Sequence, residues 1–273
     1  MSAETINLTP LLLRQLKMRE VNFLKSREVQ KLYKDEPWKM MAYGVMLRHT
    51  NMVKYQPQNN HLNYGIELEY SLKPTDYLTK QELKKCLAAG LRQMFIERGW
   101  GTNFSIEEDG TVPDGFEIVL GPNNINEVLY ALRGIGFDKL FNKFVDLDAT
   151  NVGVHITVDK FAHQWQKNLF IDVWHEPWIH TLYSNVIGRE PNQFCQLMNK
   201  RANGTYEPND YGIVSERENG SLEVRAFRNT GRIGHTGVQL QFVANIDNWI
   251  RRGGNDLDKL YEDMKEWVFL RGF

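Results

Sequence analysis

GIELEY, at residues 65–70, alternates apolar and acidic side chains, which is the pattern of a β-strand with two different faces. Successive side chains of a β-strand point to opposite faces, so Glu67 and Glu69 share one face while Ile66 and Leu68 occupy the other. An isolated Glu-x-Glu pattern is most often the solvated face of a half-buried strand. The stretch therefore predicts a strand with one core-forming face and one acidic face, whose role depends on its neighbours.

Three later stretches repeat this arrangement of one apolar and one polar face: GFEIV at 115–119, GVHITV at 153–158 and SLEVRAFR at 221–228. Glu117 is a lone carboxylate in an apolar run, where Thr or Val is the more usual strand residue. His155 faces away from its apolar neighbours, and Glu223 shares a face with Arg225. Taken singly, His155 is most simply a structural histidine, and Glu223 with Arg225 is most simply a surface ion pair that contributes about 0.5 kcal/mol. Together they predict a sheet whose polar face gathers carboxylates, an imidazole and a guanidinium.

Local signals predict helices and hairpins between these strands. Thr79 and Glu82 have capping-box spacing, which predicts a helix start. Asp109-Gly110 and Asn219-Gly220 predict turns between paired strands. Helices are expected over residues 9–32, 79–98, 124–134, 161–187, 236–251 and 256–268. Hairpins with intervening helices predict an α+β fold with a mainly antiparallel sheet and helices on one face.

Charge and turn composition divide the chain at about residue 60. Residues 11–60 hold ten Lys or Arg against four Asp or Glu, and apolar residues recur with a rough helical period in the first part of this segment. Residues 56–61, QPQNNH, form a linker-like stretch. We therefore expect a basic helical N-terminal arm at 1–60 and one main domain at 61–273. A solvated helical face is the simplest explanation of the basic charge, and contact with nucleic acid is the alternative.

Composition indicates an ordinary globular chain, with 42% hydrophobic and 25% charged residues. The longest apolar stretch near the start, Leu11 to Leu13, is too short for a membrane span or a signal peptide. Cys86 and Cys195 lie far apart and form no CxxC pattern. The expectation is a cytoplasmic protein with reduced thiols and no membrane partner.

Carboxylates on neighbouring strands would repel one another unless cations lie between them. Oxygen ligands suit Mg²⁺ or Mn²⁺, and magnesium held by few carboxylates leaves positions for phosphate oxygens. An arginine beside such a metal suits a phosphoryl group. The chain contains no GxxxxGK[ST], no GxGxxG after a strand, no HExxH and no GxSxG. Nucleotide binding would therefore depend on the polar face itself.

In their order along the chain, these motifs resemble the amidoligase family, carboxylate–amine ligases related in fold to glutamine synthetase and glutamate–cysteine ligase. The matching elements are GIELE at 65–69, DGT at 109–111, GFEIV at 115–119, GVHI at 153–156 and SLEVR at 221–225. Each is short, whereas the ordered set is fairly specific. The resemblance implies a glutamine synthetase-like catalytic domain whose curved antiparallel sheet holds ATP and two divalent metal ions, Mg²⁺ or Mn²⁺.

The resemblance also implies roles for individual residues. Glu67, His155 and Glu223 look like the ligands of the metal that bridges the ATP phosphates. Glu69 and Glu117 look like ligands of the metal on the acyl-substrate side. The remaining implied roles are γ-phosphate contact for Arg225 and Arg228, catalysis for Asp109, and substrate contact for Arg201, Asn203 and Tyr206.

The implied reaction is ATP-dependent formation of an amide or isopeptide-like bond through an acyl phosphate. The substrates would be small molecules or peptides that carry the carboxylate and the amine. The chain departs from the family pattern at Thr111, where serine is usual, and at Thr157, where many relatives have a second histidine. Two alternatives stay open: a catalytically inactive protein of this fold with a binding or structural role, and a ligase that acts on nucleic acid through the basic arm.

Overall fold

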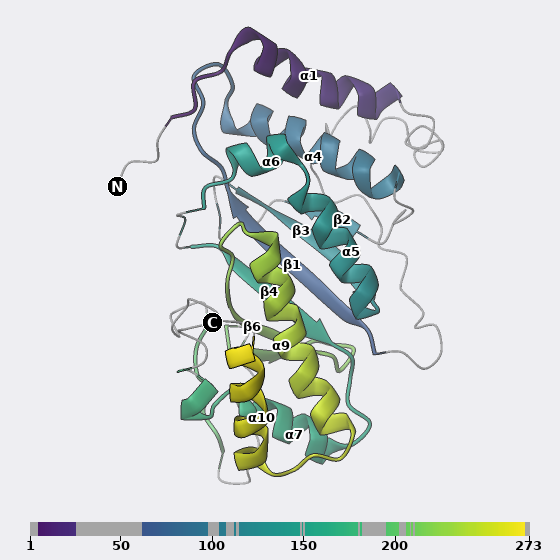
Figure 1. The fold of residues 1–273 in the computed structure, drawn as a ribbon, viewed down its shortest axis with the longest axis vertical. Coiled ribbons are helices and arrows are strands. Elements are labelled where there is room, and N and C mark those ends of the chain that lie inside the picture. Colours follow the sequence, from purple (N-terminus) through teal and green to yellow (C-terminus); the bar gives the residue numbers. More distant parts are fainter. Residues whose placement is uncertain are drawn as a thin grey trace.

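In the part of the chain that the computed structural model describes, six strands form one antiparallel sheet in the order β2-β3-β1-β4-β6-β5 (Figure 1). The strands are β1 (Tyr64–Ser71), β2 (Phe104–Glu107), β3 (Gly115–Asn123), β4 (Gly153–Val158), β5 (Val214–Glu216) and β6 (Leu222–Arg228). The described residues are 5–25, 62–97, 104–107, 112, 115–147, 149, 151–179, 181, 195–201, 206, 207, 209 and 211–270. The predicted α+β class with an antiparallel sheet is confirmed.

Helices lie against the apolar face of this sheet and beyond its ends. They are α1 (Pro10–Lys25), α4 (Lys80–Glu97), α5 (Ile125–Gly136), α6 (Lys139–Phe144), α7 (Gln164–Val173), α9 (Ile233–Arg251) and α10 (Leu257–Leu270). Figure 1 shows α5 and α9 in front of the sheet, α1 and α4 toward one end, and α7 and α10 toward the other. α4 contacts β2, α5 contacts β1 and β3, and α9 contacts β4. None of the described helices combines the length and the apolar character that crossing a bilayer requires.

The apolar face of β1 lies in the centre of the core. Ile66, Leu68 and Tyr70 are almost completely buried. Their cross-strand partners are apolar too, since Leu68 pairs with Ile118 on β3 and with Val154 on β4. Burying such a side chain stabilises the fold by about 1.5–3 kcal/mol relative to leaving it exposed. The alternation of residues 65–70 thus directs one face into the core and leaves the glutamates on the opposite face.

α1 lies along α4 (Figure 1). Leu12 and Leu16 of α1 are buried, and Arg19 pairs with Asp138 at 2.7 Å. These contacts attach the N-terminal helix to the domain that contains the sheet. The predicted helix from residue 9 is confirmed as far as Lys25. Its predicted continuation to residue 32 and the boundary near residue 60 lie outside the described residues.

Helix starts follow the capping signals. Thr79 Oγ1 accepts from the N–H of Glu82 at 3.2 Å, and Glu82 Oε2 accepts from the N–H of Thr79 at 2.9 Å, so the predicted capping box forms ahead of α4. Asn124 accepts from the N–H of Glu127 at 3.1 Å ahead of α5. Asp138 caps α6, a helix that sequence analysis does not predict. Each cap stabilises its helix by about 1 kcal/mol.

The predicted helical stretch at 161–187 is interrupted: it is helical at 164–173 and again at 177–179 and 181, with a break at 174–176, and residues 182–187 lie outside the described part of the chain. α7 ends at Val173, and the next residue, Trp174, is fully buried, with its ring centroid 5.7 Å from that of Phe227. Pro177 explains the break, because proline disfavours helical geometry at the residue before it, whereas it is tolerated in the first turn of a helix, where helical structure resumes. Trp174, at the break, therefore packs into the core between two helical segments.

β5 and β6 form the hairpin predicted around Asn219-Gly220. Gly220 has a φ of +82°, in the left-handed region that glycine adopts at no steric cost. Asn219 Oδ1 accepts from the N–H of Ser221 at 2.9 Å, which closes the turn. On its other side β6 pairs with β4, and the candidate site lies across these strands.

Candidate metal site

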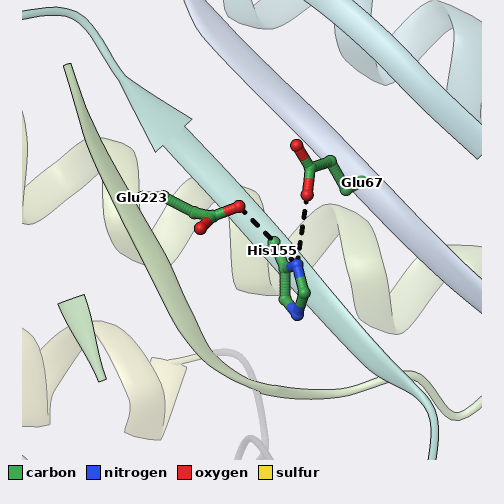
Figure 2. A group of neighbouring side chains, drawn as sticks. All are labelled: Glu67, His155 and Glu223. Atoms are coloured by element: carbon green, nitrogen blue, oxygen red, sulfur yellow. Dashed lines mark hydrogen bonds and ion pairs between the residues drawn. The ribbon is translucent and has the colours of Figure 1, made fainter. Parts of the chain in front are cut away.

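Three adjacent strands, β1, β4 and β6, bring Glu67, His155 and Glu223 together on the polar face of the sheet (Figure 2). Glu67 lies directly opposite His155 in the β1–β4 register. Glu223 lies opposite Thr157, the next position on the same face of β4. Figure 2 shows both carboxylates turned toward the imidazole ring. The three side chains share one face, as the alternation predicts, and the strand order makes them neighbours.

Atoms that can bind a metal converge within this trio. His155 Nδ1 lies 3.2 Å from Glu67 Oε2 and 3.6 Å from Glu223 Oε1. One such atom from each residue lies within 4.8 Å of the other two. Ligand atoms bound to a common ion at about 2.0–2.2 Å lie within about 4.4 Å of one another. Small side-chain rotations therefore suffice for all three residues to bind one ion.

Glu69 contacts the opposite edge of the same imidazole. Its Oε1 lies 3.4 Å from His155 Nε2, and its Oε2 accepts the N–H of Gly153 at 2.5 Å. The Glu69 side chain is buried, so this charge-assisted hydrogen bond to β4 orients it. His155 thus lies between carboxylates that face both of its ring nitrogens.

Glu69, Glu117 and Glu107 form a row across β1, β3 and β2, because their register positions are directly opposed. Like charges that face each other directly destabilise a pair of strands, so this row favours nearby positive charge. Ser105 Oγ donates to Glu107 Oε1 at 2.8 Å. Sequence analysis does not name Glu107, although the same period of two along residues 104–107 could have placed it on the acidic face.

Glu223 is completely buried and has several donors around it. Its Oε2 accepts from Ser215 Oγ at 2.9 Å and from Arg225 Nη1 at 3.1 Å. Its Oε1 faces Arg217 and His155. An isolated buried carboxylate would be strongly destabilising, and these donors offset that effect. Glu223 is therefore held in a defined orientation at the centre of the polar face.

Arg217, in the turn between β5 and β6, is a residue of the site that sequence analysis missed. Its Nη2 donates to Glu67 Oε1 at 3.1 Å and also contacts Glu223. Burial opposes ionisation of Glu67, but the hydrogen bond from His155 and the charge of Arg217 outweigh it and lower the pKa of Glu67 to about 2. Strand alternation does not mark Arg217, because side-chain direction in a turn does not follow the period of two.

A bulge in β6 decides which face Arg228 occupies. Two register pairs flank the bulge. Between these pairs β4 has one residue, His155, whereas β6 has two residues, Arg225 and Ala226. Strict alternation along β6 would put Arg228 on the apolar face. The extra residue instead puts Arg228 opposite Gly153, on the polar face that also carries Arg225.

Four further residues have roles in substrate contact or catalysis that the resemblance implies. Tyr206 donates its hydroxyl to Asp172 of α7 at 2.6 Å. Arg201 is exposed. Asn203 and Asp109 lie outside the described residues. Their assigned roles stay predictions.

The donor set fits a divalent cation. Two carboxylates and one imidazole converge from adjacent strands, with Glu69 and Glu117 alongside. Oxygen donors suit Mg²⁺ and Mn²⁺, and imidazole is a common ligand of transition metals. Among the residues of the polar face named above, carboxylates outnumber guanidinium groups. The cluster therefore keeps an excess of negative charge that attracts cations.

Fold and cluster together define an α+β protein with a candidate divalent-cation site on the polar face of an antiparallel sheet. No family model matches the chain, and no curated protein matches its sequence. The interpretation of the site therefore depends on the geometry of the donor set and on the resemblance of its motifs.

Proposed function

We propose that the chain is an ATP-dependent carboxylate–amine ligase with a glutamine synthetase-like catalytic domain that uses Mg²⁺ or Mn²⁺. One observation carries the proposal: Glu67, His155 and Glu223, which are distant in sequence, converge from three adjacent strands. They are the residues that the motif resemblance assigns to the metal bridging the ATP phosphates. A purely solvated sheet face has no need for such convergence of two carboxylates on one buried imidazole.

Two neighbouring features support the same proposal. Glu69 and Glu117, assigned by resemblance to a second metal, lie directly opposite each other in the β1–β3 register. Arg225 and Arg228 share the polar face, and Arg225 contacts Glu223. Guanidinium groups next to a metal site suit the oxygens of a transferred phosphoryl group.

The proposed reaction has two steps. An oxygen of the substrate carboxylate attacks the γ-phosphorus of ATP, which forms an acyl phosphate and releases ADP. The nitrogen of an amine then attacks the acyl carbon, and phosphate and a proton leave as the amide forms. Arg225 and Arg228 would orient the γ-phosphate, and a bound divalent cation would supply neutralisation of the phosphate charge. Positioning and electrostatics provide most of the barrier reduction in such transfers.

Magnesium-dependent ADP release tests this proposal. The assay supplies ATP, MgCl₂ and a panel of amino acids that provides both carboxylates and amines. Glu69→Gln and Glu223→Gln should each reduce ADP release by about 100-fold, because each removes a charge that organises the cation site. Glu262→Gln, an exposed position on α10, is the matched control and should retain full activity. Circular dichroism spectra of all variants check that the fold is kept.

Retained ATP consumption in both Glu69→Gln and Glu223→Gln would show that the cluster is not the site of reaction. Wild-type protein that releases no ADP with any amine would favour a second candidate function, a catalytically inactive protein of this fold with a binding or structural role. Arg217 favours that candidate, because its guanidinium pairs directly with Glu67 and Glu223. A ligase acting on nucleic acid would instead show duplex binding that weakens steeply with salt.

A further inference from the structure

Arg217 is anchored through its backbone while its side chain reaches over the acidic cluster. Its N–H donates to Ser221 O at 2.9 Å, and its carbonyl accepts from the N–H of Gly220 at 2.8 Å. These bonds hold the start of the β5–β6 turn in place. The side chain is 44% exposed, so it can turn toward solvent without disturbing the core.

The guanidinium bridges two strands that are not neighbours in the sheet. Its Nη2 lies 3.1 Å from Glu67 Oε1 and 3.4 Å from Glu67 Oε2, and it also contacts Glu223 Oε1. Glu67 belongs to β1 and Glu223 to β6, with β4 between them. Arg217 therefore spans the imidazole of His155 and joins the two carboxylates of the trio.

These contacts use the oxygens that a metal ion would need. Glu67 Oε2 and Glu223 Oε1 are the atoms closest to His155 Nδ1, at 3.2 and 3.6 Å. A divalent cation binds carboxylate oxygens at about 2.0–2.2 Å and repels a guanidinium at the same oxygens. Arg217 in this position and a cation bound by the trio exclude each other.

We propose that Arg217 is a built-in cation that competes with the divalent metal for Glu67 and Glu223, and that metal binding turns its side chain out toward solvent. This inference rests on the proposed metal site. In its inward position Arg217 relieves the repulsion between the carboxylates, so the polar face is stable without a metal. The same contact weakens metal binding, since the ion must first displace the guanidinium.

Arg225 differs from Arg217 in ways that limit the proposal to one arginine. Arg225 binds the other oxygen of Glu223, Oε2, at 3.1 Å. Its backbone lies within β6, and only 17% of its side chain is exposed. Metal binding at Glu223 Oε1 leaves this contact in place. Arg225 therefore stays as a fixed partner of Glu223, whereas Arg217 exchanges with the ion.

Calorimetric titration with MnCl₂ tests the competition directly. Arg217→Ala should bind Mn²⁺ about tenfold more tightly than the wild type, because the competing charge is gone. Arg252→Ala removes the same charge from an exposed position at the end of α9 and should bind like the wild type. Arg217→Gln serves as a second variant with a longer side chain, and it should behave as Arg217→Ala does.

Thermal unfolding provides a readout that a merely structural arginine would not give. With EDTA, Arg217→Ala should melt below the wild type, because the carboxylates lose a positive partner. With saturating MnCl₂ this difference should disappear, since the ion replaces the guanidinium. A structural role predicts the same difference in both conditions.

The outcomes separate this inference from the proposed function. If neither the wild type nor the Arg217 variants bind Mn²⁺, the metal site itself is wrong and the competition falls with it. If the wild type binds Mn²⁺ and both Arg217 variants bind it equally or more weakly, the metal site stands and the competition is overturned. If only the Arg217 variants bind Mn²⁺, the guanidinium of Arg217 excludes the ion completely from the wild-type site, which supports the competition.

Discussion

Replacing Glu67 with glutamine should destabilise the protein by on the order of 3 kcal/mol at neutral pH in the presence of EDTA. Burial opposes the charge of this carboxylate, but the His155 hydrogen bond and Arg217 lower its pKa from 4.5 to about 2. One pKa unit corresponds to about 1.36 kcal/mol, so this interval amounts to roughly 3 kcal/mol. The side chain is only 23% exposed, so solvent screening reduces the effect only in part.

The pH dependence of this loss identifies its cause. A carboxyl group whose pKa is lowered by folding contributes stability that is fully present above its unfolded pKa and is lost as pH falls through its folded pKa. The difference between wild type and Glu67→Gln should therefore fall by about half or more between pH 7 and pH 3. Urea unfolding followed by circular dichroism at the two pH values measures it. Glu262→Gln should change stability by less than about 0.5 kcal/mol at both.

Two results would refute this reasoning. An equal loss at pH 7 and pH 3 would show that Glu67→Gln acts through packing and not through charge. No loss at pH 7 would show that the contacts of Glu67 with His155 and Arg217 do not stabilise the ionised carboxylate. In either case the electrostatic description of the cluster would need to be replaced.

Two further predictions concern residues outside the trio. Burial raises the pKa of Asp247 from 3.8 to about 6. The ionised carboxylate therefore destabilises the folded protein fully above about pH 6, and this destabilisation is lost as the pH falls below the ordinary pKa of 3.8. Asp247→Asn should therefore be more stable than the wild type by on the order of 3 kcal/mol at pH 7 and equally stable near pH 3, as urea unfolding can measure; an advantage that persists at pH 3 would contradict the assignment. Gly115→Ala should destabilise the fold by more than about 3 kcal/mol, because its Cβ would lie 1.9 Å from the carbonyl oxygen of Tyr70 on β1. An unchanged thermal midpoint for Gly115→Ala would mean that β1 and β3 approach each other less closely there.

Local sequence was sufficient for the parts of the fold that depend on neighbours in the chain. The period of two assigned Glu67, Glu69 and His155 to polar faces of their strands, because alternation is a property of a single extended segment. The capping box of Thr79 and Glu82 started α4 for the same reason, since both partners lie within one helical turn. The continuous helix expected across residues 174–176 was wrong, because core burial of Trp174 and the proline at 177 interrupt it before helical structure resumes.

Tertiary structure decided which of these faces meet. Strand order and register place Glu67 beside His155 and one step from Glu223, and both depend on packing between segments distant in sequence. The bulge that returns Arg228 to the polar face breaks the alternation from which sequence reasoning starts. Arg217 belongs to a turn, where no periodicity predicts the side-chain direction. Only the tertiary structure brings its guanidinium to Glu67 of β1 and Glu223 of β6. Local alternation therefore fixes the chemistry of each strand face, whereas the non-local pairing of the strands brings those faces together as a site.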